Sequence, residues 1–217
     1  RNHKNGRLKL RIKIFPWYTN WKNIIANVRN NGPGDDWLRW DGIKGMMDGS
    51  LGSRTAWMHE PYLVDLLSPE KEDLPTVGII TLQDTTDFKH ILRETDKANI
   101  QHAVHAIGDR ANDWILDEFA LIRDEYGQKD RRCRIEHSQH LSKSAVPRFG
   151  AENIIPSMQP YHIYDDGSWA HKRIDHDRLT RTYVFKTLIE SGANLTFGSD
   201  WTVAPLNPVT GIYAAVT

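Results

Sequence analysis

The sequence predicts an α/β fold, specifically a partial TIM-type (β/α) barrel with about six of the eight strand–helix units. Short apolar segments alternate with amphipathic ones, which is typical of a parallel sheet covered by helices. Three predicted strands end on His105, His137 and Asp200, and such barrels carry functional side chains at the carboxyl ends of their strands. At 217 residues, the chain is long enough for one domain with a sizeable core, spanning 1–217.

The first elements are short and polar. Residues 7–15 alternate basic and apolar side chains, and this period of two predicts a solvated edge strand. A helix is expected near residues 19–30 and a strand over 41–44. Residues 48–62 form a long loop with glycines at 49 and 52, of a kind that is often functional on barrels. Residues 63–82 show no regular pattern.

Helical periodicity is clearest in the middle of the chain. Thr86 is expected to cap a helix, and after the strand that ends at His105, Asp109 is expected to cap another that ends near Gly127. The apolar faces of these two helices contain Phe88, Ile91, Leu92 and Thr95 in the first, and Ile115, Phe119 and Ile122 in the second. The pattern then predicts a strand over 134–137, a helix over 142–150, a strand over 153–158, a loop over 161–177, a helix over 178–191, a strand ending at 199–200 and a last helix from 212.

Composition excludes several function classes. The net charge is zero and the pI is about 7.3, which argues against nucleic acid as a partner. No apolar run approaches the roughly 20 residues of a membrane helix. The single cysteine, Cys133, rules out an internal disulfide framework, leaving the compartment open, with the cytoplasm favoured. Because the chain starts at Arg1 and stops within a predicted helix, we expect a fragment of a longer protein.

The three strand ends point to a metal site. A single histidine beside a turn is usually a structural residue. Three strand–helix units ending on His105, His137 and Asp200 fit a metal site much better, because imidazole and carboxylate bind Zn, Fe, Mn or Ni. We expect a divalent metal, with zinc favoured.

Several segments carry a family resemblance. Residues 105–111 (HAIGDRA), 134–137 (RIEH) and 198–201 (GSDW) together resemble the amidohydrolase superfamily, and in particular amidohydrolase family 3, which includes the YtcJ-like metal-dependent hydrolases. Residues 48–56, 158–160 and 207–215 are also similar to that group. The segments occur in the family's order along the whole chain.

The resemblance implies one or two metal ions in the mouth of the barrel. It assigns His105, His137 and Asp200 to the ligand positions on the fifth, sixth and eighth strands. Lys44 falls at the fourth-strand lysine, which CO₂ can carbamylate when its amine is neutral. That match is softer, because Gly45 stands where a larger apolar residue is expected, and an ordinary solvent-facing lysine is the alternative.

One expected pair of ligands is missing from the sequence. Family members carry His-x-His on the first strand, whereas His3 stands alone here. His102 and His105 are spaced H-x-x-H, so on a strand they face opposite sides. His102 is therefore expected to be packed or to lie behind the ligands.

The implied activity is hydrolysis of a C–N bond, in an amide or cyclic amide, by metal-activated water. Asp200 would accept the proton of the water and pass it to the leaving nitrogen. Asp109, Arg110 and Glu136 are candidates to orient the imidazoles, although Glu136, adjacent to His137 on a strand, is expected to face away from it. The substrate-binding candidates, each of which could equally hold a loop in place, are Arg54, Gln159, His162 and Trp201.

Two alternatives stay open at this stage. The same site could cleave an ester or phosphoester, or the chain could be an inactive fragment lacking the His-x-His ligands. The expected partner is a small-molecule substrate, with neither nucleic acid nor membrane. An incomplete barrel also leaves unpaired strand edges, through which a homo-oligomer could form.

Overall fold

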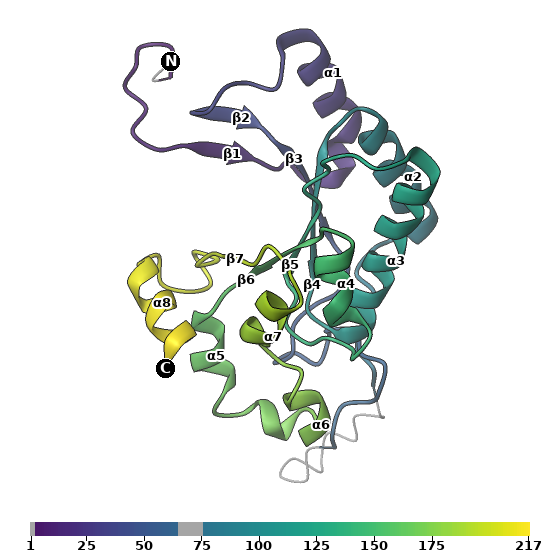
Figure 1. Cartoon of the computed structure of the whole chain (residues 1–217), viewed down its shortest axis with the longest axis vertical. Helices are drawn as coiled ribbons and strands as arrows, with labels where there is room; N and C mark the ends of the chain where they lie inside the picture. The colour runs from purple at the N-terminus through teal and green to yellow at the C-terminus, as the bar shows by residue number, and fades with distance from the viewer. Residues whose placement is uncertain (1–2, 65–75) are drawn as a thin grey trace.

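The structure is a computed structural model that describes residues 3–64 and 76–217. Its centre is a five-stranded sheet in which every neighbouring pair is parallel and the spatial order follows the sequence (Figure 1). The expected α/β barrel segment is thereby confirmed. The strands of this sheet are β3 (Gly42–Met46), β4 (Gln101–Ala106), β5 (Arg134–His137), β6 (Ile155–Met158) and β7 (Thr196–Phe197).

A sixth strand position lies beside β3. The short strands β1 (Ile12–Ile14) and β2 (Leu38–Trp40) pair in parallel. The chain after β1 continues along β3, where the Lys44 amide donates to the Pro16 carbonyl at 2.8 Å. The predicted N-terminal strand is therefore present, although its regular part is shorter than residues 7–15, and it lies at the solvent-exposed edge.

Helices cover one face of the sheet, where the main apolar core forms. Val104 and Ile135 of the sheet pack there with Phe88 and Ile115 from the helices. Among the residues that the structure describes, no helix is long and apolar enough to cross a membrane. The longer helices are α1 (Trp21–Asn31), α2 (Thr85–Lys97), α3 (Asp109–Tyr126) and α8 (Pro208–Val216), and the shorter ones are η1 (Tyr18–Asn20), α4 (Ala145–Ala151), α5 (Tyr161–Asp166), η2 (Ala170–Lys172), α6 (His176–Leu179) and α7 (Phe185–Glu190).

Two predicted helix caps are wrong by one or two residues. Asp84, and not Thr86, caps α2, because its carboxylate accepts the amides of Thr86 and Asp87 at 2.7 and 3.2 Å. Gly108 holds the cap position of α3, and Asp109 is the first helical residue. The end of α3 is as expected, with Gly127 at a φ of 75°.

The predicted pattern after β6 also needs correction. The expected loop over 161–177 contains the short helices α5 and η2, and the expected helix over 178–191 is divided into α6 and α7. The division falls at Tyr183, which has a φ of 52°. Its amide donates to the Gln139 carbonyl at 3.0 Å, so this segment bonds to the loop after β5 instead of continuing a helix.

Gly45 is explained by packing on the helical side of β3. A Cβ at this position would lie 2.7 Å from the ring of Phe88, which is fully buried. Ile43, two residues earlier on the same face, is also buried, with Ile24 and Ile91. Because successive residues of a strand alternate in direction, Lys44 faces the opposite side, away from the helices.

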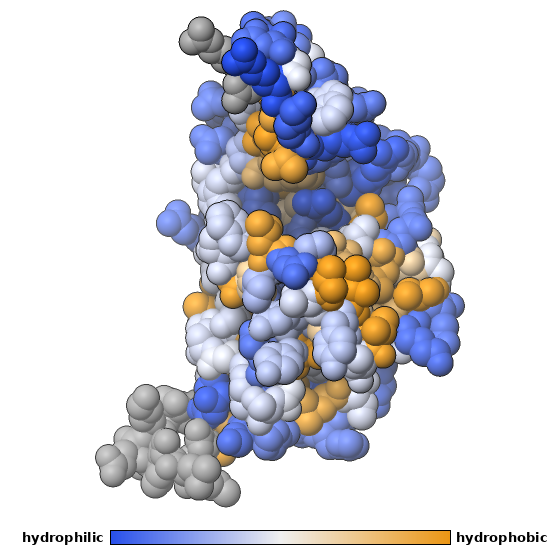
Figure 2. Space-filling view, turned by 90° about the vertical axis from the view of Figure 1, so that its left-hand side faces the viewer, coloured by the Kyte–Doolittle hydropathy of each residue, from blue (hydrophilic) through white to orange (hydrophobic). Residues whose placement is uncertain are grey.

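Apolar side chains are exposed at the carboxyl-terminal part of the chain. Phe197 of β7 is about half exposed. More than half of each side chain is exposed at Leu206, Val209 and Ile212, around α8. Figure 2 shows apolar residues gathered near the middle of the face that carries these elements. Self-association through the open strand edges stays a prediction.

His102 faces the helices, opposite to His105, as the strand alternation requires. Thr95 Oγ1 donates to the Ile91 carbonyl at 2.7 Å and so accepts from His102 Nε2 at 2.8 Å. The ring stacks on Phe119 with 5.9 Å between centroids. Burial lowers the pKa of His102 to about 4 from its ordinary 6.5, so the folded protein holds it as a neutral imidazole.

We predict that His102 makes the fold acid-sensitive. Because its pKa is lower in the folded than in the unfolded chain, the unfolded state binds more protons between pH 6.5 and 4. Stability should therefore fall as pH drops through this window, by up to about 3 kcal/mol from this group. Denaturant unfolding of wild type and His102→Met across pH 4–7 checks this, with a flatter profile expected for the variant. Parallel profiles would contradict it.

Candidate metal centre

The carboxyl ends of the strands bring several histidines and a carboxylate together. Ligand atoms of His137, His162 and Asp200 all lie within 4.8 Å of one another. The ring of His105, on β4, contacts that of His137 with 4.5 Å between centroids. This group includes His162, which the sequence suggested only as a substrate contact. His105 lies beside the group, in ring contact with His137.

The backbone at His137 breaks the alternation of β5. Ile135 packs in the helical core, so Glu136 points to the opposite face, where Ser157 Oγ donates to it at 2.8 Å. Regular alternation would return His137 to the helices, but its φ of 76° turns the side chain back. Lys44 interacts electrostatically with both Glu136 and His137. The expectation that Glu136 faces away from His137 is therefore wrong.

His162 reaches the cluster from α5, the helix after β6. Its Nε2 lies 3.9 Å from Asp200 Oδ2, and its ring stacks on that of His137 with 5.9 Å between centroids. One helical turn later, Asp166 accepts hydrogen bonds from the Tyr183 hydroxyl at 2.6 Å and from Gln139 Nε2 at 2.7 Å. These bonds fix α5, and with it His162, against the loops after β5 and α6.

Lys44 lies near the cluster in a surrounding that favours its neutral form. Burial is the main cause that lowers the pKa of Lys44, and Arg134 acts in the same direction. Glu136 and Asp200 oppose this shift because their negative charges stabilise the ammonium. A lowered lysine pKa is the condition that carbamylation of this amine requires.

The donor atoms fit a divalent metal ion. His137 Nδ1 and His162 Nε2 are both buried without a hydrogen-bond partner among the described residues. Burial is the main cause that lowers the pKa of His137 well below its ordinary value. Electrostatic interactions with His105, Lys44 and His162 act in the same direction. A neutral imidazole with a free lone pair is the form that binds metal, and two histidines plus a carboxylate are a common catalytic zinc set.

The other substrate candidates differ in their positions. Gln159 is buried, and its Nε2 donates to the Ser157 carbonyl at 3.1 Å, while its side chain also bonds to His137. Trp201 follows Asp200 but is 64% exposed. Arg54 lies in the turn after Leu51, at a φ of 57°. Gln159 and His162 both contact His137 of the cluster.

One residue of the site had no role assigned from the sequence. Asp48, at the end of β3, is fully buried, and its carboxylate lies 3.4 Å from His105 Nε2. Its sequence signals were its place at the start of the glycine-containing loop and within residues 48–56, which resemble the family, but neither gave it a role. Asp109, by contrast, does not orient an imidazole of the cluster: it accepts the amides of His59 and Arg110, each at 2.9 Å.

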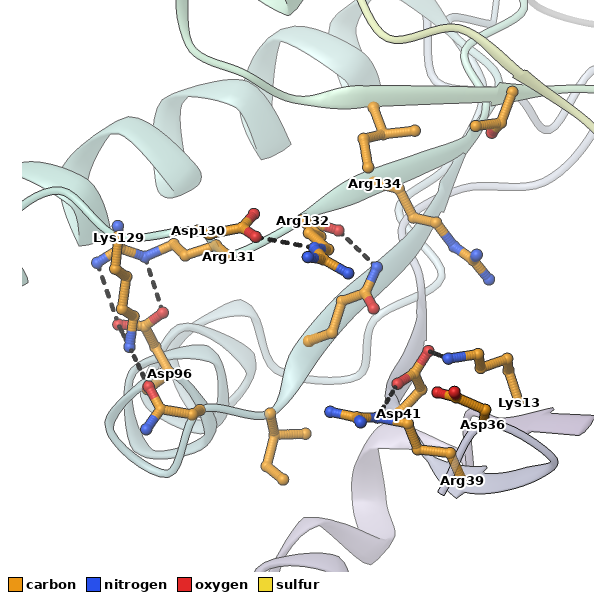
Figure 3. A pocket seen from close by; sticks show the side chains of 15 residues that line it. Lys13, Asp36, Arg39, Asp41, Asp96, Lys129, Asp130, Arg131, Arg132 and Arg134 are labelled. Carbon is orange, nitrogen blue, oxygen red and sulfur yellow. Dashed lines mark hydrogen bonds and ion pairs between the residues drawn. The ribbon is translucent and has the colours of Figure 1, made fainter. Parts of the chain in front are cut away.

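Two cavities lie at different distances from this cluster. The larger, about 640 Å³, lies at the amino ends of the strands and is lined by charged residues (Figure 3). Its cations are largely paired, as in Arg131 with Asp96 at 2.8 Å and Arg39 with Asp41 at 2.7 Å. The smaller, about 360 Å³ and mostly apolar, lies between α5 and α8 and reaches Ser199, next to Asp200.

A parallel α/β sheet with histidines and an aspartate at its carboxyl edge is typical of metal-dependent hydrolases built on α/β barrels. The chain belongs to the amidohydrolase family, whose sequence profile matches residues 3–217.

Relatives and solved structures agree with this family. The chain is 35% identical over 212 residues to the Arabidopsis thaliana protein LONG AFTER FAR-RED 3, covering 97% of this chain and 35% of that protein. It is 29% identical to the putative amidohydrolase YtcJ of Bacillus subtilis, covering 83% of this chain and 32% of that protein. An uncharacterized metal-dependent hydrolase of Pyrococcus furiosus matches with a TM-score of 0.81 and 27% identity, over 100% of this chain and 42% of that chain. The chain therefore spans about a third of the length of these two sequence relatives.

We predict that His162 contributes to metal binding. Because its Nε2 is buried and faces the cluster, His162→Ala should weaken Zn²⁺ binding by more than about tenfold. Chelator competition on the metal-free protein measures this, and His171→Ala, which changes an exposed histidine on η2, is the matched control. Equal affinities for the two variants would show that His162 does not hold the ion.

Proposed function

We propose that this chain forms part of a metal-dependent hydrolase that cleaves a C–N bond in an amide or cyclic amide. The observation that carries the proposal is the cluster at the carboxyl edge, where ligand atoms of His137, His162 and Asp200 lie within 4.8 Å of one another. In this cluster, His137 Nδ1 and His162 Nε2 are buried without a hydrogen-bond partner among the described residues. We assign His105, His137, Asp200 and Lys44 as metal ligands, with zinc as the first candidate, and add His162 as a further ligand because it lies in the same cluster as His137 and Asp200. The printed name of the relative YtcJ, a putative amidohydrolase, supports the choice of bond.

When bound, the metal would polarise the substrate carbonyl and lower the pKa of water from 15.7 toward about 7. Asp200 is the residue proposed to accept the proton of the attacking water and to return it to the leaving nitrogen. The position of its carboxylate beside His137 and His162, with partial exposure, supports this role. Glu136 and Arg134 form an ion pair of 2.6 Å on the same side as Lys44 and balance the charge near that amine.

The substrate is proposed to be a small molecule. Gln159 and His162 are the nearest candidates to contact it, with Arg54 and Trp201 further along the surrounding loops. The mostly apolar cavity next to Ser199, with Tyr161 and Phe197 in its lining, supports a substrate with an apolar group, because such pockets are typical of small-molecule sites.

Asp200→Asn is expected to lower turnover by about 10²–10⁴-fold while the fold is kept, because an amide does not accept the proton. The measurement is the hydrolysis rate of the complete gene product with zinc, over a panel of amides, cyclic amides and esters. Asp165→Asn, which changes an exposed carboxylate on α5, is the matched control and should retain its rate.

A near-normal rate for Asp200→Asn on the best substrate would exclude the proposed role of Asp200. If the wild-type protein hydrolyses esters and not amides, the proposed cleavage of a C–N bond is wrong and the activity is ester hydrolysis.

A further inference from the structure

Asp48 binds two separate segments of backbone at the edge of the sheet. Its Oδ1 accepts the Ile107 amide at 3.0 Å, and its Oδ2 accepts the amides of Gly108 and Trp57 at 2.8 Å each. The carboxylate is fully buried. It therefore joins the end of β3 to the corner that links β4 with α3, just beyond His105.

The corner packs closely against the backbone of Trp57. A Cβ on Gly108 would lie 2.0 Å from the Trp57 carbonyl oxygen, so the backbone segments at Gly108 and Trp57 are in direct contact. Gly108 also holds the cap position of α3. Because Asp48 accepts amides from both segments, its carboxylate helps to hold the corner just after β4 in place.

The same carboxylate and its neighbour act on the His105 ring. His105 Nε2 lies 3.0 Å from the Gly49 carbonyl and 3.4 Å from Asp48 Oδ1. Both of these oxygens are acceptors, so Nε2 must carry the ring proton. The lone pair of the neutral ring is then on Nδ1.

We propose that Asp48 is a positioning residue for the metal centre. Together with Gly49, it holds His105 as the Nε2–H tautomer and so presents Nδ1 to the ion beside His137. The inference deepens the proposed function and rests on it. Carboxylates and carbonyls commonly fix metal-binding imidazoles in this way, and their loss typically costs 10–100-fold in affinity.

A matched control separates this role from loop stabilisation. Asp109 is also buried, and it also accepts two backbone amides, those of His59 and Arg110. Asp109→Asn should disturb a loop of the same region without acting on His105. Asp48→Asn replaces an acceptor oxygen with an NH₂ group facing amide donors and the His105 N–H.

The first experiment is nitrogen NMR of the complete gene product with ¹⁵N-labelled histidine. Without metal, His105 should show the Nε2–H tautomer, and with ¹¹³Cd²⁺ it should show cadmium coupling at Nδ1. Coupling at Nε2, or none at His105 while His137 couples, would overturn the inference and leave the metal centre standing. No cadmium coupling at any histidine would overturn the inference and the proposed function together.

The second experiment is Zn²⁺ competition titration of the two variants. Asp48→Asn should bind 10–100-fold more weakly than wild type, and Asp109→Asn should change little. Equal losses for the two variants, or wild-type affinity for Asp48→Asn, would overturn the inference. If Asp48→Asn does not fold, the ¹¹³Cd spectrum of the wild-type protein decides.

Discussion

Parallel pairing of β3 to β7 in sequence order brings the carboxyl end of every strand to one edge of the sheet. That constraint places His105, His137 and Asp200, which are far apart in the chain, at the same edge. The opposite edge collects the strand starts, and there charged residues pair with one another around the larger cavity. The separation of the two edges is why the candidate ligands His105, His137 and Asp200 gather at the same edge.

The edge that carries the cluster departs from regular backbone geometry. His137, Ser138 and Asp200 all have positive φ values, of 76°, 45° and 55°. Such conformations cost about 1–3 kcal/mol each in non-glycine residues. The pairing of β5 with β4 fixes the chain at His137, and the strained residues include two of the proposed ligands. Observed strain at a cluster of donors supports a functional role for it.

The sequence was informative where local pattern decides the structure. Strand ends at His105 and His137 followed from apolar segments before turns, and the opposite directions of His102 and His105 followed from the period of two. The residues that cap the helices were harder to predict. Thr86 and Asp109 are both reasonable caps by type, and only the geometry shows that Asp84 and Gly108 hold those positions.

Contacts between distant segments could not be predicted from one sequence. The role of Asp48 depends on backbone amides 9, 59 and 60 residues away. The place of His162 depends on a short helix, α5, held by Asp166, Gln139 and Tyr183. The positive φ of His137, which brings it to the same side as Glu136, has no signal in the residue type. Each of these features is part of the candidate site.

The central claim is that the carboxyl edge of the sheet holds a metal ion. Anomalous diffraction from crystals of the zinc-loaded complete protein, collected on both sides of the zinc edge, tests it most directly. We predict a peak about 2.0–2.2 Å from donor atoms of His137 and Asp200. A peak only among the charged residues at the amino ends of the strands, or none in protein that binds zinc in solution, would contradict it.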